Sequence, residues 1–425
     1  MNENIDYPIT LFSIFAILIT LSALFSYINQ RFIKLPTTIG LMLIALLMSL
    51  SIIALDNFNL DLGLGDQIRH LMENIDFNTT LMQGMLSFLL FAGALHVNLD
   101  DLAKDKWIIG IMATLGVCLS TFLIGYTSWW LLEKIGLELP LIYCLLFGSL
   151  ISPTDPIAVL GILKKAGAPK ALETKITGES LFNDGVGVVI FIVLLGIAIG
   201  DTEASASGIA TLFALEAFGG ILFGLAIGAL AYAMLKSIDN YQVEILITLA
   251  VVSGGYALAH AIHVSGPIAI VVAGLLIGNH GRFLAMSDKT REHLDLFWEL
   301  IDEILNAILF IMIGLEVLVL TFEMHYLVAG LFLIPIVLAA RFLSVSIPVL
   351  FLRQKQTFSD NAIKIMTWGG LRGGISVALA LSLPVGNERD IILVATYVIV
   401  VFSIVVQGLS IGKLIKSSAH EKLAE

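Results

Sequence analysis

The chain has 425 residues, of which 58% are hydrophobic and only 13% are charged, and its mean hydropathy is +0.96. Soluble domains carry about 25% charged residues, so this composition excludes an ordinary soluble protein and indicates a polytopic membrane protein. The net charge of −11, without a basic patch that carries interleaved aromatic residues, argues against a nucleic-acid partner. Cys118 and Cys144 lie in apolar runs without ligand spacing, so we expect packing roles rather than a zinc site or disulfides.

Apolar runs near the roughly 20 residues needed to cross the hydrocarbon core of a bilayer occur about 13 times. They cover residues 8–29, 36–55, 78–98, 107–133, 141–163, 171–199, 208–235, 241–260, 264–279, 294–320, 326–352, 362–384 and 390–413. The first run lacks the positive flank and cleavage site of a signal peptide, so we expect it to remain as a helix. We predict an all-α protein with a single transmembrane domain over residues 8–414 and a short cytoplasmic tail over 415–425.

The distribution of Lys and Arg predicts the orientation, because translocation of positive charge across the membrane is disfavoured. With the N-terminus outside, most of the 23 Lys and Arg residues fall in the inner loops and the C-terminal segment. The outer segments hold only Arg69, Lys134 and Arg389. We therefore expect a multi-pass protein of the cell (inner) membrane, with its N-terminus outside and its C-terminus in the cytoplasm.

The fifth run, 141–163, is interrupted by the sequence SPTDP at residues 152–156. Proline inside a helix removes a backbone hydrogen bond and clashes with the preceding turn, so Pro153 and Pro156 predict a break in mid-membrane. Thr154 and Asp155 lie at this break. Secondary transporters bind their substrates at such discontinuous helices, although Asp155 has an alternative role as a cap for exposed amides.

The sixth run carries polar residues on two faces of one predicted helix. Ser180 and Asp184 are four residues apart and share a face, while Glu179 and Asn183 share a neighbouring face. An ionisable group near the bilayer centre costs about 2.5–3.5 kcal/mol on insertion scales and usually marks an ion or proton pathway. Asp184 is therefore the leading candidate for the functional carboxylate.

The twelfth run contains a second interruption, because four glycines surround Arg372 in the sequence GGLRGG at residues 369–374. The two interruptions are seven spans apart, so they run through the membrane in opposite directions. This offset predicts that spans 1–6 and 8–13 are inverted repeats, with span 7 between them. A buried arginine needs a partner, and we expect Glu179 to form a structural ion pair with Arg372.

Four sequences resemble the bacterial NhaP-type branch of the monovalent cation:proton antiporters, which is related to the animal sodium/proton exchangers. They are SPTDP at 152–156, GESLFNDG at 178–185, FWELIDEILN at 297–306 and GGLRGG at 369–374. The resemblance covers nearly the whole chain and implies an NhaA-like antiporter fold and a homodimer, with a dimerisation part and a moving six-helix core.

The resemblance also implies roles for individual residues. Asp184 is expected to carry the cation and the proton, Asn183 and Asp155 to support it, and Thr154 and Ser180 to help ligate the cation. The expected cation ligands are thus Asp184, Asp155, Thr154 and Ser180, a set of oxygen donors suited to Na⁺, with Li⁺ or K⁺ as alternatives. Glu179 and Arg372 are expected to form the buried pair.

These residues predict antiport without a cofactor. Burial and the neighbouring Asp155 favour the neutral form of Asp184, while a bound cation favours the charged form, so proton and cation compete for one group. Because Asn183 is an amide and carries no second proton, we expect one cation to exchange for one proton without net charge movement. This function corresponds to pH and sodium homeostasis, not to an enzyme.

Two other functions remain open from the residues alone. A cation channel needs a pore lined with carbonyl or charged rings, and the sequence shows no repeated filter. An intramembrane aspartyl protease needs two aspartates that share a proton, for which Asp155 and Asp184 are the candidates. The sequence does not decide whether His280, His293, Asp302 or Glu303 regulates the protein.

Overall fold

The computed structural model describes residues 11–57, 80–155, 159, 163, 168–200, 206–320, 323–353, 358 and 361–424. Within these ranges the regular structure is entirely helical, which confirms the predicted all-α fold. Among the described residues, eight helices are long and apolar enough to cross a membrane, and shorter apolar helices lie between them. The protein is therefore a multi-pass membrane protein.

Every expected span contains described helix. The α-helices are α1 (Leu11–Ile28), α2 (Thr37–Asn57), α5 (Leu86–Leu95), α6 (Leu99–Lys104), α7 (Lys106–Ile111), α8 (Val117–Lys134), α9 (Leu141–Ile151), α11 (Lys170–Ile199), α12 (Ala206–Lys236), α13 (Tyr241–Ala261), α14 (Gly266–Leu276), α15 (Arg282–Leu284), α16 (Asp288–Glu316), α17 (Met324–Leu352), α18 (Ala362–Trp368), α19 (Gly374–Leu381), α20 (Asn387–Phe402) and α21 (Gly408–Ala424). Five π-helical segments interrupt or extend them: η1 (Asn29–Ile33), η2 (Thr80–Met85), η3 (Met112–Gly116), η4 (Ile277–Gly281) and η5 (Ser403–Gln407).

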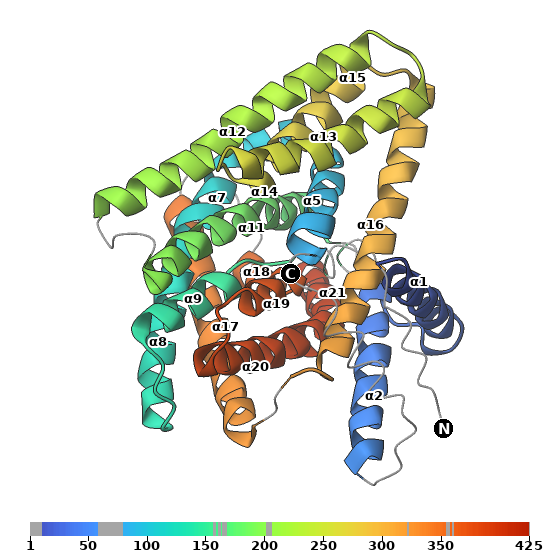
Figure 1. Ribbon diagram of the computed structural model, residues 1–425. Helices are drawn as coiled ribbons and strands as arrows, with labels where there is room; N and C mark the ends of the chain where they lie inside the picture. The colour runs from blue at the N-terminus through green and yellow to red at the C-terminus, as the bar shows by residue number, and fades with distance from the viewer. Residues whose placement is uncertain are drawn as a thin grey trace.

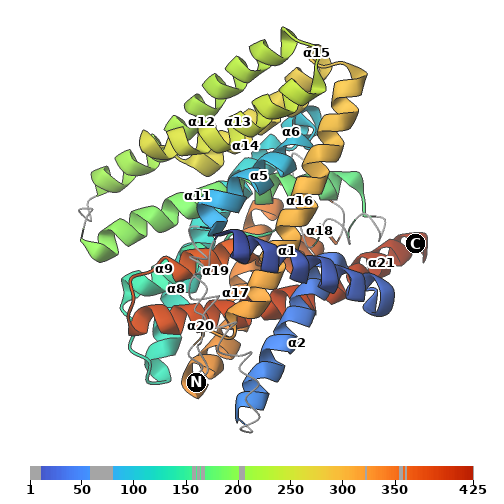
Figure 2. The ribbon, with the colours of Figure 1, turned by 45° about the vertical axis from the view of Figure 1, so that its right-hand side comes forward.

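The helices form two groups that α11 and α16 connect. In one group α12, α13 and α14 pack on one another and on α5; in the other α8, α9, α17 and α20 pack together (Figure 1). The long helix α16 runs from the first group to the second and packs against α1 and α2, as both side views show (Figure 2). The helices beside the two predicted breaks, α9 and α18 with α19, lie in the second group, where α9 and α19 contact α11.

The first break begins where α9 ends at Ile151, directly before Ser152 and Pro153. Thr154 and Asp155 follow without helical structure, as expected, while Pro156 lies outside the described residues. The second break separates α18, which ends at Trp368, from α19, which begins at Gly374. Both predicted interruptions are therefore present.

The two breaks face each other and are joined by a backbone hydrogen bond. The amide of Asp155 donates to the carbonyl of Leu371 over 2.8 Å. Unpaired backbone groups are costly in a membrane interior, so each unwound segment stabilises the other. By contrast, α17 contains Pro335 and Pro348 and stays helical throughout.

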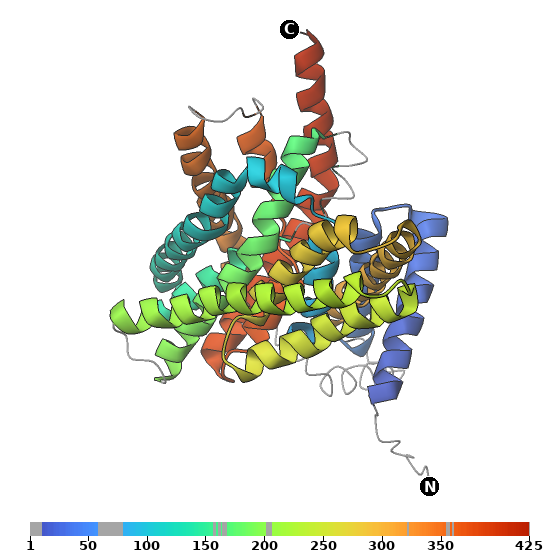
Figure 3. The ribbon, with the colours of Figure 1, turned by 90° about the horizontal axis from the view of Figure 1, so that it is seen from above.

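Four segments that carry basic residues end on one side of the molecule. Figure 3 shows the C-terminal end of α21 projecting on one side of the molecule. Helix α6, the C-terminal end of α17 and the N-terminal end of α18 lie on the same side. Lys104, Arg353, Lys364 and Lys413 belong to these segments.

Candidate cation-binding site

Asp184 lies in the middle of α11, a helix of 30 residues that contains no proline. Its side chain is only 6% exposed, and Ser180 and Asn183 in the same turn are also buried. Pro153, at the first break, packs directly on the Cα of Gly187, where a side chain on residue 187 would collide with its ring. The small residue thus brings the polar part of α11 against the unwound segment.

Three of the predicted site residues form a closed hydrogen-bond group between α11 and the first break. The Asn183 amide nitrogen donates to the Thr154 hydroxyl over 2.9 Å, and the Thr154 backbone amide donates to the Asn183 Oδ1 over 3.3 Å. The hydroxyls of Thr154 and Ser180 are 3.0 Å apart. Asn183 therefore fixes the position of Thr154, and the two hydroxyl oxygens lie within reach of one small ion.

Asp155, also at the first break, contacts the second break. Its carboxylate packs on the Cα of Gly373, where any side chain would overlap it. Asp155 is also close enough to Asp184 for their negative charges to repel each other. The structure thus brings together all five residues predicted to bind the cation or the proton: Asp184, Asp155, Asn183, Thr154 and Ser180.

The prediction that Glu179 forms its ion pair with Arg372 is wrong. Glu179 instead accepts a bidentate pair of hydrogen bonds from Arg341 of α17, one of them from Nη2 to Oε2 over 2.9 Å. Arg341 also donates to the carbonyl of Met366, over 3.2 Å. A buried bidentate pair of this kind joins α11 to α17 and to the end of α18.

Arg372 turns its side chain back onto its own segment. Its guanidinium donates to the carbonyl of Gly370 over 2.7 Å, because the unwinding at residues 369–373 leaves that carbonyl without a helical donor. Its backbone amide donates to the Ser403 hydroxyl over 2.9 Å. Arg372 therefore stabilises the break itself, while it remains within electrostatic reach of Glu179 and Arg341.

Sequence reasoning missed three residues that support the site. Arg341 holds Glu179, and Ser403 and Gln407 of η5 provide hydrogen bonds to the second break. A signal for Arg341 was present, since an arginine inside a hydrophobic span requires a partner. Ser403 and Gln407 carried no such signal, because the π-helical turn that aims them inward follows no pattern visible in the residues.

Comparisons with known proteins agree with this arrangement. A sequence model of the family described as "Sodium/hydrogen exchanger, transmembrane" matches residues 19–417. The chain belongs to the sodium/hydrogen exchanger family. It is 53% identical to the Na(+)/H(+) antiporter NhaP of Pseudomonas aeruginosa, over 94% of this chain and 95% of that protein. It is 33% identical to the Na(+)/H(+) antiporter NhaH of Halobacillus dabanensis, over 91% of this chain and 93% of the relative.

The fold of this exchanger-family member matches that of a solved structure, the sodium proton antiporter MjNhaP1 of Methanocaldococcus jannaschii. The TM-score is 0.74 at 19% sequence identity, covering 95% of this chain and 98% of the other. At this identity the match concerns the fold alone. It confirms the antiporter fold expected from the motifs.

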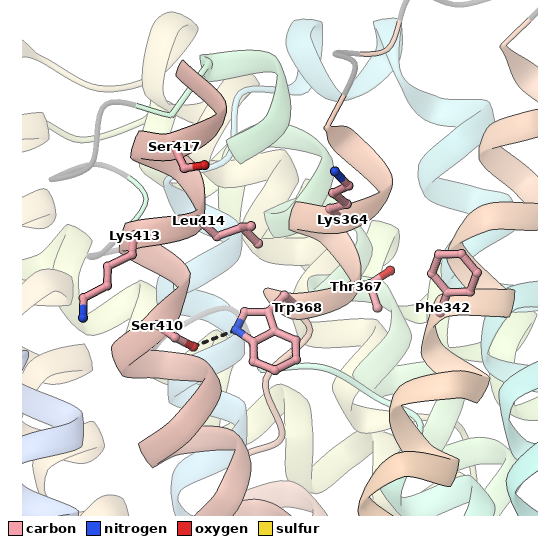
Figure 4. A pocket seen from close by; sticks show the side chains of 8 residues that line it. All are labelled: Phe342, Lys364, Thr367, Trp368, Ser410, Lys413, Leu414 and Ser417. Carbon is pink, nitrogen blue, oxygen red and sulfur yellow. Dashed lines mark hydrogen bonds between the residues drawn. The ribbon is translucent and has the colours of Figure 1, made fainter. Parts of the chain in front are cut away.

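A cavity of about 610 Å³ opens in this exchanger away from the site (Figure 4). It lies between α17, α18 and α21, where the Trp368 indole donates to the Ser410 hydroxyl over 2.8 Å. None of the five predicted binding residues lines it.

In the part of the chain that the structure describes, no group of three or more His, Cys, Asp or Glu residues is arranged to hold a metal ion.

A double-mutant cycle tests which arginine holds Glu179. We expect Glu179→Gln or Arg341→Gln alone to destabilise the purified exchanger by about 3–5 kcal/mol, because each strands a buried charge. Combining them should recover part of that loss, with a coupling energy of about 1–3 kcal/mol from thermal unfolding in detergent. The same cycle with Arg372→Gln is the control and should give a smaller coupling. A larger coupling with Arg372 than with Arg341 would contradict the geometry.

Proposed function

We propose that this protein is a secondary active antiporter that exchanges Na⁺ for H⁺, with Asp184 as the group that carries each of them in turn. The observation that supports this most directly is a buried carboxylate beside two hydroxyls, at the point where two broken helices meet. The names of the relatives favour Na⁺, while Li⁺ and K⁺ remain possible cations for the same oxygen ligands. No cofactor is needed for this exchange.

Competition for Asp184 couples the two fluxes. A protonated Asp184 is neutral and tolerates its buried position, and a bound cation neutralises the same carboxylate. Thr154, Ser180 and Asp155 supply further oxygen ligands, while Asn183 holds Thr154 in place. If the loaded site changes its exposure and the charged empty site does not, each cation that crosses in one direction requires a proton to cross in the other.

The charges in and around the site favour one cation per proton. Arg341 and Arg372 provide two positive charges, and Glu179, Asp155 and Asp184 provide up to three negative charges. One negative charge remains, which a single proton or a single monovalent cation neutralises. The amide at Asn183 binds no additional proton, so both loaded states carry the same net charge.

We further propose the arrangement that such exchange requires. The domain over residues 8–414 works as a homodimer in the cell (inner) membrane, with its N-terminus outside and the tail over 415–425 in the cytoplasm. Spans 1–6 and 8–13 form the inverted repeats, and a six-helix core with both breaks moves against a dimerisation part. Membership of the exchanger family argues against the channel and protease alternatives.

Replacing the central carboxylate tests this assignment. In everted membrane vesicles, Asp184→Asn should lower Na⁺-dependent proton movement at least about 100-fold, because an amide can neither release a proton nor neutralise a cation. The matched control is Asp288→Asn, since the Asp288 side chain is 97% exposed at the start of α16. Both variants are scanned over several cations and pH values. Exchange that survives in Asp184→Asn would show that another residue carries the ions.

The charge balance predicts electroneutral transport. In proteoliposomes, the rate of Na⁺/H⁺ exchange should not change when the membrane potential is clamped at different values with K⁺ and valinomycin. Asn183→Asp offers a comparison, because a second ionisable group at that position allows a second proton to move. Current that accompanies Na⁺ flux in the unmodified protein would refute the proposed stoichiometry.

A further inference from the structure

One face of α16 points at the candidate site. Asp302, Asn306 and Leu309 are spaced so that they lie on the same side of this helix. Leu309 packs on Gly374, where an added Cβ would lie 2.5 Å from the Leu309 Cδ1. Gly373, the next residue, packs on the carboxylate of Asp155. The face that carries Asp302 and Asn306 therefore leads along α16 to the second break and to Asp155.

The polar side chains on this face are incompletely hydrogen-bonded. Asn306 is only 4% exposed, and its Oδ1 is buried without a hydrogen-bond partner. The Asp302 carboxylate, one turn away, is in hydrogen-bonding contact with Asn306 and within electrostatic reach of Asp155. A buried carbonyl oxygen without a hydrogen-bond donor is energetically costly. The position therefore favours a ligand that an oxygen lone pair can coordinate, such as a cation.

The other end of this face reaches the expected inner surface. Arg282, which follows η4, binds Asp295 of α16 through two hydrogen bonds of 2.6 and 2.8 Å. Asp302 lies about two turns deeper than Asp295. Directly after the facing helix, α5, the exposed His96 lies within electrostatic reach of Asp302, and its ring is 2.8 Å from the carbonyl oxygen of Ala92.

Packing fixes the two helices that enclose this region. The rings of Phe91 of α5 and Trp298 of α16 are 4.6 Å apart, and the Trp298 indole donates to the Thr248 hydroxyl over 3.1 Å. Trp298 lies one turn before Asp302 on α16. Asp302 is thus within electrostatic reach of both the exposed His96 and the Asp155 carboxylate of the site.

We propose that Asp302 and Asn306 form a second binding site for a monovalent cation, through which the cation passes between the cytoplasmic face and Asp184. The Asp302 carboxylate and the Asn306 carbonyl oxygen are its protein ligands, and water completes the shell. This inference rests on the proposed antiport and on the proposed orientation. It adds a step on the inner side and leaves the exchange at Asp184 unchanged.

The test measures the apparent affinity for Na⁺ at the inner face. Everted vesicles expose that face, and a pH of about 8.5 keeps proton competition weak. Asp302→Asn should raise the KM for Na⁺ about fivefold while kcat stays within about twofold, as expected for the loss of one charge near the path. Asn306→Leu, which keeps the volume but removes the oxygen, should raise KM in the same direction.

Two further variants separate a binding role from a structural one. Glu303→Gln is the matched control, since Glu303 is the next residue and is exposed, and it should change KM less than about twofold. In the double variant Asp302→Asn with Asn306→Asp, the carboxylate returns one turn deeper and should restore KM. A structural role for Asp302 would not be rescued in this way.

The outcomes distinguish this site from the main one. If Asp184→Asn abolishes exchange but Asp302→Asn leaves KM unchanged, or changes it no more than Glu303→Gln does, the second site is wrong and the proposed antiport stands. A failure of rescue by Asn306→Asp in protein that folds with normal thermal stability would likewise overturn it. If Asp184→Asn still exchanges, the proposed function itself fails.

Discussion

Two unwound backbone segments inside a membrane protein must satisfy their hydrogen-bonding groups within the protein, and the rest of this structure depends on how they do so. Lipid offers no donors or acceptors, so a break in one helix is stable only beside suitable partners. Here the Asp155 amide binds the Leu371 carbonyl, and Ser403 and Gln407 bind groups of the second break. The crossing of the two breaks then places Thr154 and Asp155 beside the part of α11 that carries Asp184.

The same constraint explains why arginines lie so close to the candidate cation site. An anionic cluster that must accept a cation cannot be neutralised fully by the protein, yet it cannot be left with several uncompensated charges. Arg341 is engaged by Glu179, and Arg372 is engaged by the Gly370 carbonyl. Each arginine therefore has a hydrogen-bond acceptor in the protein, and in the proposed mechanism Asp184 keeps the one charge that a proton or a cation neutralises.

The sequence predicted the fold where a local physical rule decides the outcome. Hydropathy located the spans, and proline at residue 153 and the glycines at 369–374 located the breaks. The polar residues of the site could be chosen because charge and amide groups are expensive at mid-membrane depth. The structure places Asp184, Asp155, Asn183, Thr154 and Ser180 together, while their roles in transport stay predictions.

Features that depend on which helices are neighbours could not be predicted in this way. Among the described residues, Arg341 and Arg372 are both buried, and only the packing of α17 beside α11 and α18 selects Arg341 as the partner of Glu179. Pro335 and Pro348 obey the same local rule as Pro153 but leave α17 helical. The face of α16 with Asp302 and Asn306 became visible only when its contact with Gly374 was known.

The central claim is that a proton and a cation occupy one carboxylate in turn, and proton release on cation binding tests it most directly. Na⁺ is added to purified protein in weakly buffered detergent solution at a pH where the site is protonated, and a pH dye reports the protons released. The account predicts about one proton per Na⁺ bound, and an apparent Kd for Na⁺ that rises about tenfold for each unit of falling pH. Saturable Na⁺ binding with no proton release would contradict it.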